Sequence, residues 1–174
     1  MIYTTDRLIA RPMTPNDLPA LRRTLMDPHA MEAYAHAFTE DEVQAWLANQ
    51  LRRYHEDGFG LWGLVRRSGG GWVGQCGLTM QTFNGQAVVE IGYLLQRDQW
   101  HQGYAIEAAQ GAKQYAFAQP AITRVWSIIR DTNLASMNVA IRNGMVVRGR
   151  MIKHYYGQAM PHLGFAVDRP ADGV

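Results

Sequence analysis

The residues from Trp100 to Ala105 have the types and spacing that bind an anion. They follow residues 88–95, an apolar and β-branched stretch that is typical of a buried strand. Alanines recur after them at helical spacing, which predicts a helix that lies close against a sheet. Gly103 lets the backbone approach a ligand, and the first N–H groups of the helix lack intrahelical partners. The helix dipole adds about half a positive charge there, so the segment is predicted to hold an anion such as a diphosphate.

Polar side chains occupy two further positions where they could do chemistry. Asn133 and Ser136 are three residues apart on a predicted helix over residues 133–143, so they share one of its faces. They could contact a ligand, cap the helix, or do both. Glu90 interrupts the apolar strand before the glycine loop. Burial there would raise its pKa toward the range of a general base, whereas a solvent-facing position or an ion pair is the structural alternative.

The two segments together resemble the GNAT superfamily of N-acetyltransferases, which bind acetyl-CoA. The first resembles the family's pyrophosphate loop, (Gln/Arg)-x-x-Gly-x-(Gly/Ala), whose defining positions are occupied by Trp100, Gly103 and Ala105. The second resembles Asn-x-x-Ser…Lys-x-Gly-Phe of the branch that includes ribosomal-protein N-terminal (Rim-type) acetyltransferases. That motif is matched by Asn133, Ser136, Arg142, Gly144 and Met145. Residues 5–12 resemble the first strand of the same branch, so specific motifs occur in the family's order at three points.

The resemblance implies an α/β (α+β) fold, with a mixed, mostly antiparallel sheet that is flanked by helices and splayed at the cofactor site. In the family, the strand that contains Glu90 separates from its neighbour, here residues 123–129, and pantetheine binds in the gap. An N–H near Gly92 could then stabilise a developing oxyanion, although a glycine tolerated for packing is the alternative. The implied acetyl-CoA-binding residues are Ile91, Gly92, Tyr93, His101, Gln102, Gly103, Tyr104, Ala105, Asn133 and Arg142.

The implied reaction is direct attack of a primary amine on the thioester, with Ser136 as proton donor and Glu90 as general base. Many family members use a tyrosine one turn after the serine as the acid, but that position is Ala140 here. An α-amine with a pKa near 8 needs about 1 kcal/mol for deprotonation at pH 7, whereas a lysine-like amine needs roughly 4 to 5 kcal/mol. These features favour the α-amine of a peptide N-terminus or an amino-acid-like metabolite as acceptor.

Three other functions stay open at this point. One is acetylation of a small molecule such as a polyamine, an antibiotic or another metabolite, and a second is a catalytically silent CoA-binding module. The third, a dinucleotide-binding domain, is disfavoured because no Gly-x-Gly-x-x-Gly follows the first strand. The stretches that border the acceptor in the family, residues 27–38 and 149–161, carry no recognisable specificity pattern.

The composition predicts one globular domain over residues 1–174. Its 47% hydrophobic and 18% charged content allows a sizeable core, and the net charge of +2 is too small to indicate nucleic-acid binding. The histidines lack zinc-site spacing, so no metal is expected. Cys76 is the only cysteine, which excludes an internal disulfide and fits a reducing compartment. The sequence shows no membrane-spanning run or signal peptide, so a cytoplasmic monomer or homodimer is expected.

Local patterns place the remaining elements around these motifs. Thr39 and Glu42 have capping-box spacing and predict the start of an amphipathic helix that ends near Gly58. Asn84-Gly85 predicts a tight hairpin turn. A last hairpin is predicted from strands at 145–156 and 162–167, joined by a turn over residues 157–161, and residues 170–174 are expected to fray.

Overall fold

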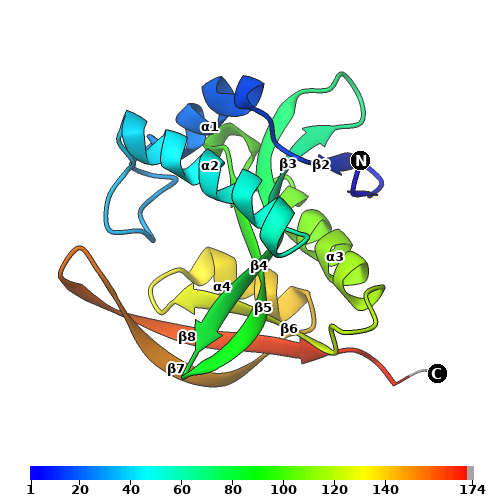
Figure 1. The fold of residues 1–174 in the computed structure, drawn as a ribbon, viewed down its shortest axis with the longest axis vertical. Helices are drawn as coiled ribbons and strands as arrows, with labels where there is room; N and C mark the ends of the chain where they lie inside the picture. The colour runs from blue at the N-terminus through cyan, green and yellow to red at the C-terminus, as the bar shows by residue number, and fades with distance from the viewer. Residues whose placement is uncertain (172–174) are drawn as a thin grey trace.

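An eight-stranded mixed sheet runs through the computed structural model, which describes residues 1–171 (Figure 1). The strand order is β1-β2-β3-β4-β5-β6-β8-β7, and all neighbours are antiparallel except β5 and β6, which are parallel. This confirms the predicted fold class. The strands are β1 (Tyr3–Thr4), β2 (Leu8–Arg11), β3 (Leu61–Arg66), β4 (Trp72–Phe83), β5 (Gln86–Leu95), β6 (Arg124–Arg130), β7 (Val146–Tyr155) and β8 (Gln158–Asp168).

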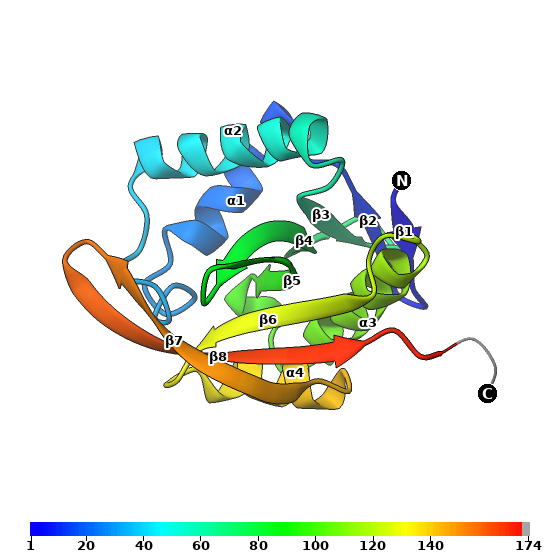
Figure 2. The same cartoon turned by 60° about the horizontal axis from the view of Figure 1, so that its bottom comes forward.

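Helices cover both faces of the sheet (Figure 2). They are α1 (Leu18–Leu25), α2 (Glu40–Glu56), α3 (Tyr104–Phe117) and α4 (Leu134–Arg142). Residues 1–171 form three apolar clusters, and two of them lie on opposite faces of the sheet because neighbouring strand residues point to opposite faces. Leu61 packs with the buried side chains of α1 and α2, whereas Trp62 packs with those of α3. Ala109, Ala112 and Ala116 of the predicted small-residue stripe are fully buried in the cluster that contains Trp62, whereas Ala105 at the start of α3 is only partly buried.

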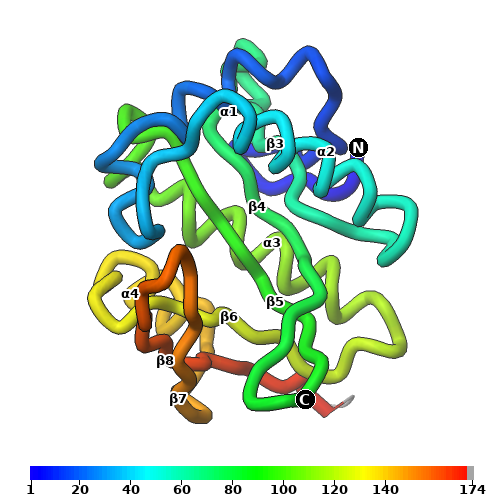
Figure 3. The backbone as a smooth tube through the Cα atoms, turned by 60° about the vertical axis from the view of Figure 1, so that its left-hand side comes forward, coloured from blue at the N-terminus to red at the C-terminus, as the bar shows by residue number. Residues whose placement is uncertain are grey.

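The sheet splays between β5 and β6. These two strands share one parallel residue pair, Glu90 with Trp126, and then separate (Figure 3). On its other edge β5 remains paired with β4 along its whole length, and β6 pairs throughout with β8. A side-chain bond, from Ser127 Oγ to the carbonyl of Ile91 at 2.8 Å, links the separating strands. The predicted splay at the carboxyl end of β5 is therefore confirmed.

Turn chemistry explains where the local predictions succeed and where they fail. Thr39 and Glu42 form the predicted capping box at the start of α2, and Asn84 and Gly85 both have positive φ, as the hairpin turn requires. The predicted long turn over residues 157–161 is wrong. Tyr156 and Gly157 adopt positive φ and close a two-residue turn, so β8 begins at Gln158. Of the residues predicted to fray, Asp172–Val174 lie outside the described residues.

Candidate active site

Two cavities meet at the carboxyl end of β5. The first, of about 530 Å³, lies against the glycine loop and the start of α3, and we call it the loop cavity. The second, of about 380 Å³, contains the side chain of Glu90, and we call it the Glu90 cavity. The residues that line both cavities are Ala30, Ala33, Tyr93, Leu94, Asn133 and Ser136. The two cavities therefore adjoin at these six residues, and molecules bound in the two cavities would lie next to each other there.

The glycine loop presents backbone to the loop cavity. Gly103 is the residue before α3, its φ of 80° is in the left-handed region, and no side chain caps the helix there. The amide groups of the first turn consequently remain available to an anion. Of the residues predicted in this loop, His101, Gly103, Tyr104 and Ala105 line the cavity. Gln102 does not line the cavity, because its carbonyl turns away toward Arg7.

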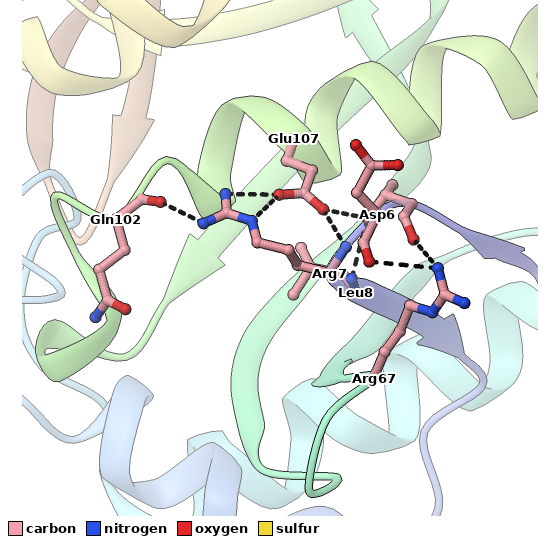
Figure 4. Close-up of polar contacts among 7 residues, drawn as sticks. Asp6, Arg7, Leu8, Arg67, Gln102 and Glu107 are labelled. Atoms are coloured by element: carbon pink, nitrogen blue, oxygen red, sulfur yellow. Dashed lines mark hydrogen bonds and ion pairs between the residues drawn. The ribbon is translucent and has the colours of Figure 1, made fainter.

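Arg7 fastens the glycine loop to the first two strands (Figure 4). Its Nη1 donates to the carbonyl of Gln102 at 2.9 Å, and its Nε donates to Glu107 Oε2 at 2.6 Å. Its backbone N–H and the hydroxyl of Thr5 both donate to Glu107 Oε1. Burial alone would raise the pKa of Glu107, but these bonds from Thr5 and Arg7 hold it below its ordinary value. The start of α3 is thus fixed by an ionised carboxylate on its first turn.

Helix α4 supplies the next set of predicted residues. Asn133 Oδ1 accepts the backbone N–H of Ser136 at 3.0 Å, so Asn133 caps the helix while it lines both cavities. Ser136 lines both cavities, and its hydroxyl has no hydrogen bond to any residue in 1–171. Arg142 lines the loop cavity from the end of α4. Arg97 is close to the glycine loop in sequence but does not line the loop cavity, and its Nε lies 3.5 Å from Asp27 Oδ2.

Strand β5 contributes the residues at the junction. Glu90, Ile91, Gly92 and Tyr93 all line the Glu90 cavity, and Tyr93 also lines the loop cavity. The Tyr93 hydroxyl donates to the carbonyl of Ser136 at 2.7 Å and so joins β5 to α4 across the splay. A Cβ at Gly92 would lie 3.3 Å from Leu61. Close packing is therefore one reason for glycine at this position.

Glu90 has the environment of a proton acceptor. Its Oε1 accepts the backbone N–H of Ile128 at 2.9 Å, and its Oε2 accepts the Thr79 hydroxyl at 3.4 Å. Burial raises the pKa of Glu90, and the opposing influence of Lys153, these two bonds and Arg53 only partly offsets that rise. A raised pKa brings a carboxylate closer to the range in which it is an effective base at neutral pH. The structure thus places Glu90 inside a cavity rather than in a surface ion pair.

Several residues of the Glu90 cavity could not be recognised in the sequence. Arg53, Arg130, Lys153 and Tyr155 come from three separate elements, and no local motif connects them. His162 also lines the cavity, and burial lowers its pKa below the ordinary value, so it is neutral at pH 7. His154, on the same hairpin, does not line it.

Two other kinds of chemistry find no support in residues 1–171. Cys76 is fully buried, and burial raises the pKa of its thiol to about 12, so a reactive thiolate does not form near neutral pH. No group of three or more histidine, cysteine, aspartate or glutamate side chains within these residues could hold a metal ion.

None of the helices over the same residues is long and apolar enough to cross a bilayer.

Comparison with known proteins decides the family. Residues 7–146 match the family described as acetyltransferase (GNAT) domain. The chain belongs to the GNAT family of acetyltransferases. It is an acetyl-CoA-dependent N-acetyltransferase, which confirms the recognition made from the motifs around Gly103 and Asn133. A relative in sequence is the uncharacterized protein YkkB of Bacillus subtilis, which is 33% identical over 142 residues that cover 81% of this chain and 83% of YkkB.

Solved GNAT structures have the same fold. One is the Salmonella typhimurium acetyltransferase that modifies the N-terminal serine of ribosomal protein L7/L12, with a TM-score of 0.77, 18% identity, and 95% of this chain and 96% of that chain covered. Another is spermidine N-acetyltransferase from Vibrio cholerae, in complex with CoA and spermine, with a TM-score of 0.74, 13% identity, and 92% and 95% covered. At these identities the likeness concerns the fold, so it does not select an acceptor for this chain.

The loop cavity fits acetyl-CoA on the geometry described above. The uncapped amides at the start of α3 suit a diphosphate, and Gly103 leaves open the space that a Cβ would occupy beside Arg7. Arg142 and His101 line the same cavity. The gap between β5 and β6 leads from this cavity to Glu90. The donor set and the shape of the cavity are therefore consistent with the co-substrate of the family.

Proposed function

We propose that this N-acetyltransferase acetylates a low-pKa α-amine, belonging to a peptide N-terminus or an amino-acid-like metabolite, by direct attack where the two cavities meet. The observation that carries the proposal is that Glu90 is the only carboxylate that lines the Glu90 cavity. A single partly buried carboxylate is adequate for an α-amine, of which about one-tenth is already neutral at pH 7. It is poorly suited to an amine that must lose its proton at a cost of roughly 4 to 5 kcal/mol at pH 7.

The residues at the junction would divide the work in the following way. Acetyl-CoA, when bound, supplies the thioester carbonyl that the amine attacks. The backbone N–H of Ile91 or Gly92 would donate to the carbonyl oxygen as negative charge develops on it. Glu90 would take a proton from the amine, directly or through a water molecule. Ser136, or a water molecule next to it, would return a proton to the leaving sulfur. Asn133 would anchor the pantetheine arm.

Few side chains at the junction could assist proton transfer. Ala140 occupies the position one turn after Ser136, it is 1% exposed, and it packs into the core with α3. Burial raises the pKa of the neighbouring Tyr93, and its hydroxyl already donates to the Ser136 carbonyl. We assign proton transfer at this junction to Glu90, Ser136 and water, and the neutral imidazole of His162 is a further proton acceptor on the wall of the Glu90 cavity. Such a site favours an acceptor that needs little help with deprotonation.

The test uses two peptide acceptors, each of which offers a single amine. One has a free α-amine and no lysine, and the other has a blocked N-terminus and one lysine. Between the ordinary pKa values of about 8 and about 10.4, the neutral fraction at pH 7 differs by roughly a few hundredfold. We expect kcat/KM for the α-amine to persist toward neutral pH, where that for the ε-amine has already fallen.

The Glu90→Gln variant completes this test. Glutamine retains an oxygen that can accept the Ile128 N–H, so the fold around it should be preserved. We expect this variant to slow the ε-amine far more than the α-amine, because the ε-amine depends more on a base. If polyamines are the best substrates and Glu90→Gln leaves the rate unchanged, both the preference for an α-amine and the assignment of Glu90 as general base are wrong. Acetyl-CoA binding without acetylation of any amine would instead favour a silent CoA-binding module.

A further inference from the structure

The Glu90 cavity carries an excess of positive charge. Three half-buried basic residues from three separate elements line it: Arg53 of α2, Arg130 of β6 and Lys153 of β7. Against these three cations the cavity wall contains one carboxylate, that of Glu90. Neutral polar groups, among them Gln81 and Asn49, complete the polar part of the wall. The cavity therefore favours an anion over a second cation.

The three cations are not neutralised by the protein. Within residues 1–171, no carboxylate lies within 4 Å of Arg53, Arg130 or Lys153, whereas Arg11 and Arg22 have carboxylate partners at 2.6 Å. Arg130 Nη1 makes long contacts, of 3.3 to 3.5 Å, to three backbone carbonyls of residues 32–34. Its Nε is buried without a hydrogen-bond partner. The Arg130 guanidinium thus makes only long contacts to neutral carbonyls, and its charge is not compensated by a carboxylate among residues 1–171.

The charges act on the same space. Lys153 and Arg53 both stabilise the ionised form of Glu90, so both lie within electrostatic reach of that carboxylate. Lys153 and Arg130 add to the effect of burial in lowering the pKa of His162. One end of the cavity therefore suits an ammonium group beside Glu90, and the surrounding wall suits an anion. This pattern is complementary to a zwitterion.

We propose that the acceptor amine carries an anionic group close to the amine, and that Arg53, Arg130 and Lys153 bind that group. The inference rests on the proposed function and narrows it. The guanidinium groups present paired donors that match a carboxylate or a phosphate. A cavity of about 380 Å³ is within the usual size range for small ligands, so it would enclose both the amine and an anionic group close to it. A polyamine would bring further positive charge against three cations.

The test compares dipeptide amides that share an N-terminal serine, so the pKa of the α-amine changes little. The second residue is aspartate, phosphoserine, asparagine or lysine. We expect kcat/KM to be roughly tenfold or more higher for the anionic dipeptides than for the asparagine dipeptide, and lowest for the lysine dipeptide, because opposite charges across a site favour association and like charges oppose it. The preference should shrink as salt rises. The aspartate and phosphoserine dipeptides distinguish a carboxylate from a phosphate as the preferred anion.

Charge variants connect the preference to the cavity. Lys153→Met and Arg53→Met should each reduce the aspartate-to-asparagine ratio, and Lys153→Glu should reverse the preference toward the lysine dipeptide. Arg52→Met is the matched control, because Arg52 precedes Arg53 on α2, pairs with Glu56 and does not line the cavity. It should leave the ratio unchanged. An acetyl-CoA-dependent rise in Tm verifies that each variant is folded.

Two outcomes separate this inference from the proposed function. Equal rates for the aspartate and asparagine dipeptides, or a preference for lysine, would overturn the inference while α-amine acetylation stands. If no α-amine is acetylated, the proposed function fails, and calorimetry on the CoA-bound protein decides the inference. The N-acetylated aspartate dipeptide should then bind more tightly than its asparagine counterpart, and equal affinities would overturn the anionic site.

Discussion

Replacing Gly103 by glutamate is expected to abolish the stabilisation that acetyl-CoA gives the wild-type protein. Gly103 has a φ of 80°, which side chains with a Cβ adopt at a cost, and it stands where the amides of α3 face the loop cavity. Glutamate would add both bulk and a negative charge at the position proposed for the diphosphate. A ligand at 100 times its Kd stabilises the wild-type protein by about 2.7 kcal/mol, which is measurable as a rise in Tm.

A matched variant distinguishes loss of acetyl-CoA binding from simple backbone strain. Gly69, in the turn between β3 and β4, has a φ of 78° and no atoms within 4 Å of an added Cβ. Gly69→Glu should lower the Tm of the free protein by a similar amount and retain the full acetyl-CoA shift. If Gly103→Glu binds acetyl-CoA as tightly as the wild-type protein, the assignment of the loop is wrong.

Replacing Ser136 by alanine should reduce kcat by about 10- to 10³-fold, the range in which general acid–base catalysis contributes. The structure makes this substitution selective. Asn133 caps α4 through the backbone N–H of Ser136, which alanine retains, and the hydroxyl that is lost has no partner among residues 1–171. The helix should therefore remain intact, and the Kd of acetyl-CoA should change much less than kcat.

The comparison of rate and affinity distinguishes a proton donor from a structural residue. Ser68→Ala, in the turn between β3 and β4, serves as the control and should leave kcat and acetyl-CoA affinity unaltered. Equal losses of rate and affinity in Ser136→Ala would indicate that the hydroxyl helps to bind the co-substrate. No loss of either would leave the residue with a structural role only, and the proton would then have to come from water.

The sequence allowed the loop and the helix caps to be predicted because both depend on short-range chemistry. Gly103 is recognisable from its own segment alone, because it stands between an apolar strand and a helix. The pairs Thr39–Glu42 and Asn133–Ser136 are recognisable because each has the three-residue spacing of a helix cap. The splay beyond Glu90 was expected from the family resemblance, since neither strand shows locally that it will separate from the other. Gly103, Asn133 and Ser136 all line the loop cavity, which we propose for the co-substrate.

The acceptor side could not be predicted because its residues meet only through the topology. Arg53 and Lys153 are separated by 100 positions, and in the sequence each is one basic residue among many. The contacts of Arg7 with Gln102 and Glu107 are invisible in the sequence for the same reason, since the pattern of residues 5–12 predicts only a strand. Conversely, Arg97 is adjacent to the loop in sequence and contacts Asp27 instead. Proximity along the chain was therefore a poor guide to which charges enter the cavities.

Initial rates of thiol release, with acetyl-CoA and an α-amine acceptor varied together, test the central claim most directly. Because the two cavities meet at Tyr93 and Ser136, both substrates should bind at once, and the double-reciprocal lines should intersect. Cys76 is buried and protonated, so it offers no route through an acetylated enzyme. Parallel lines, the kinetic signature of a covalent enzyme intermediate, would contradict direct attack at this junction.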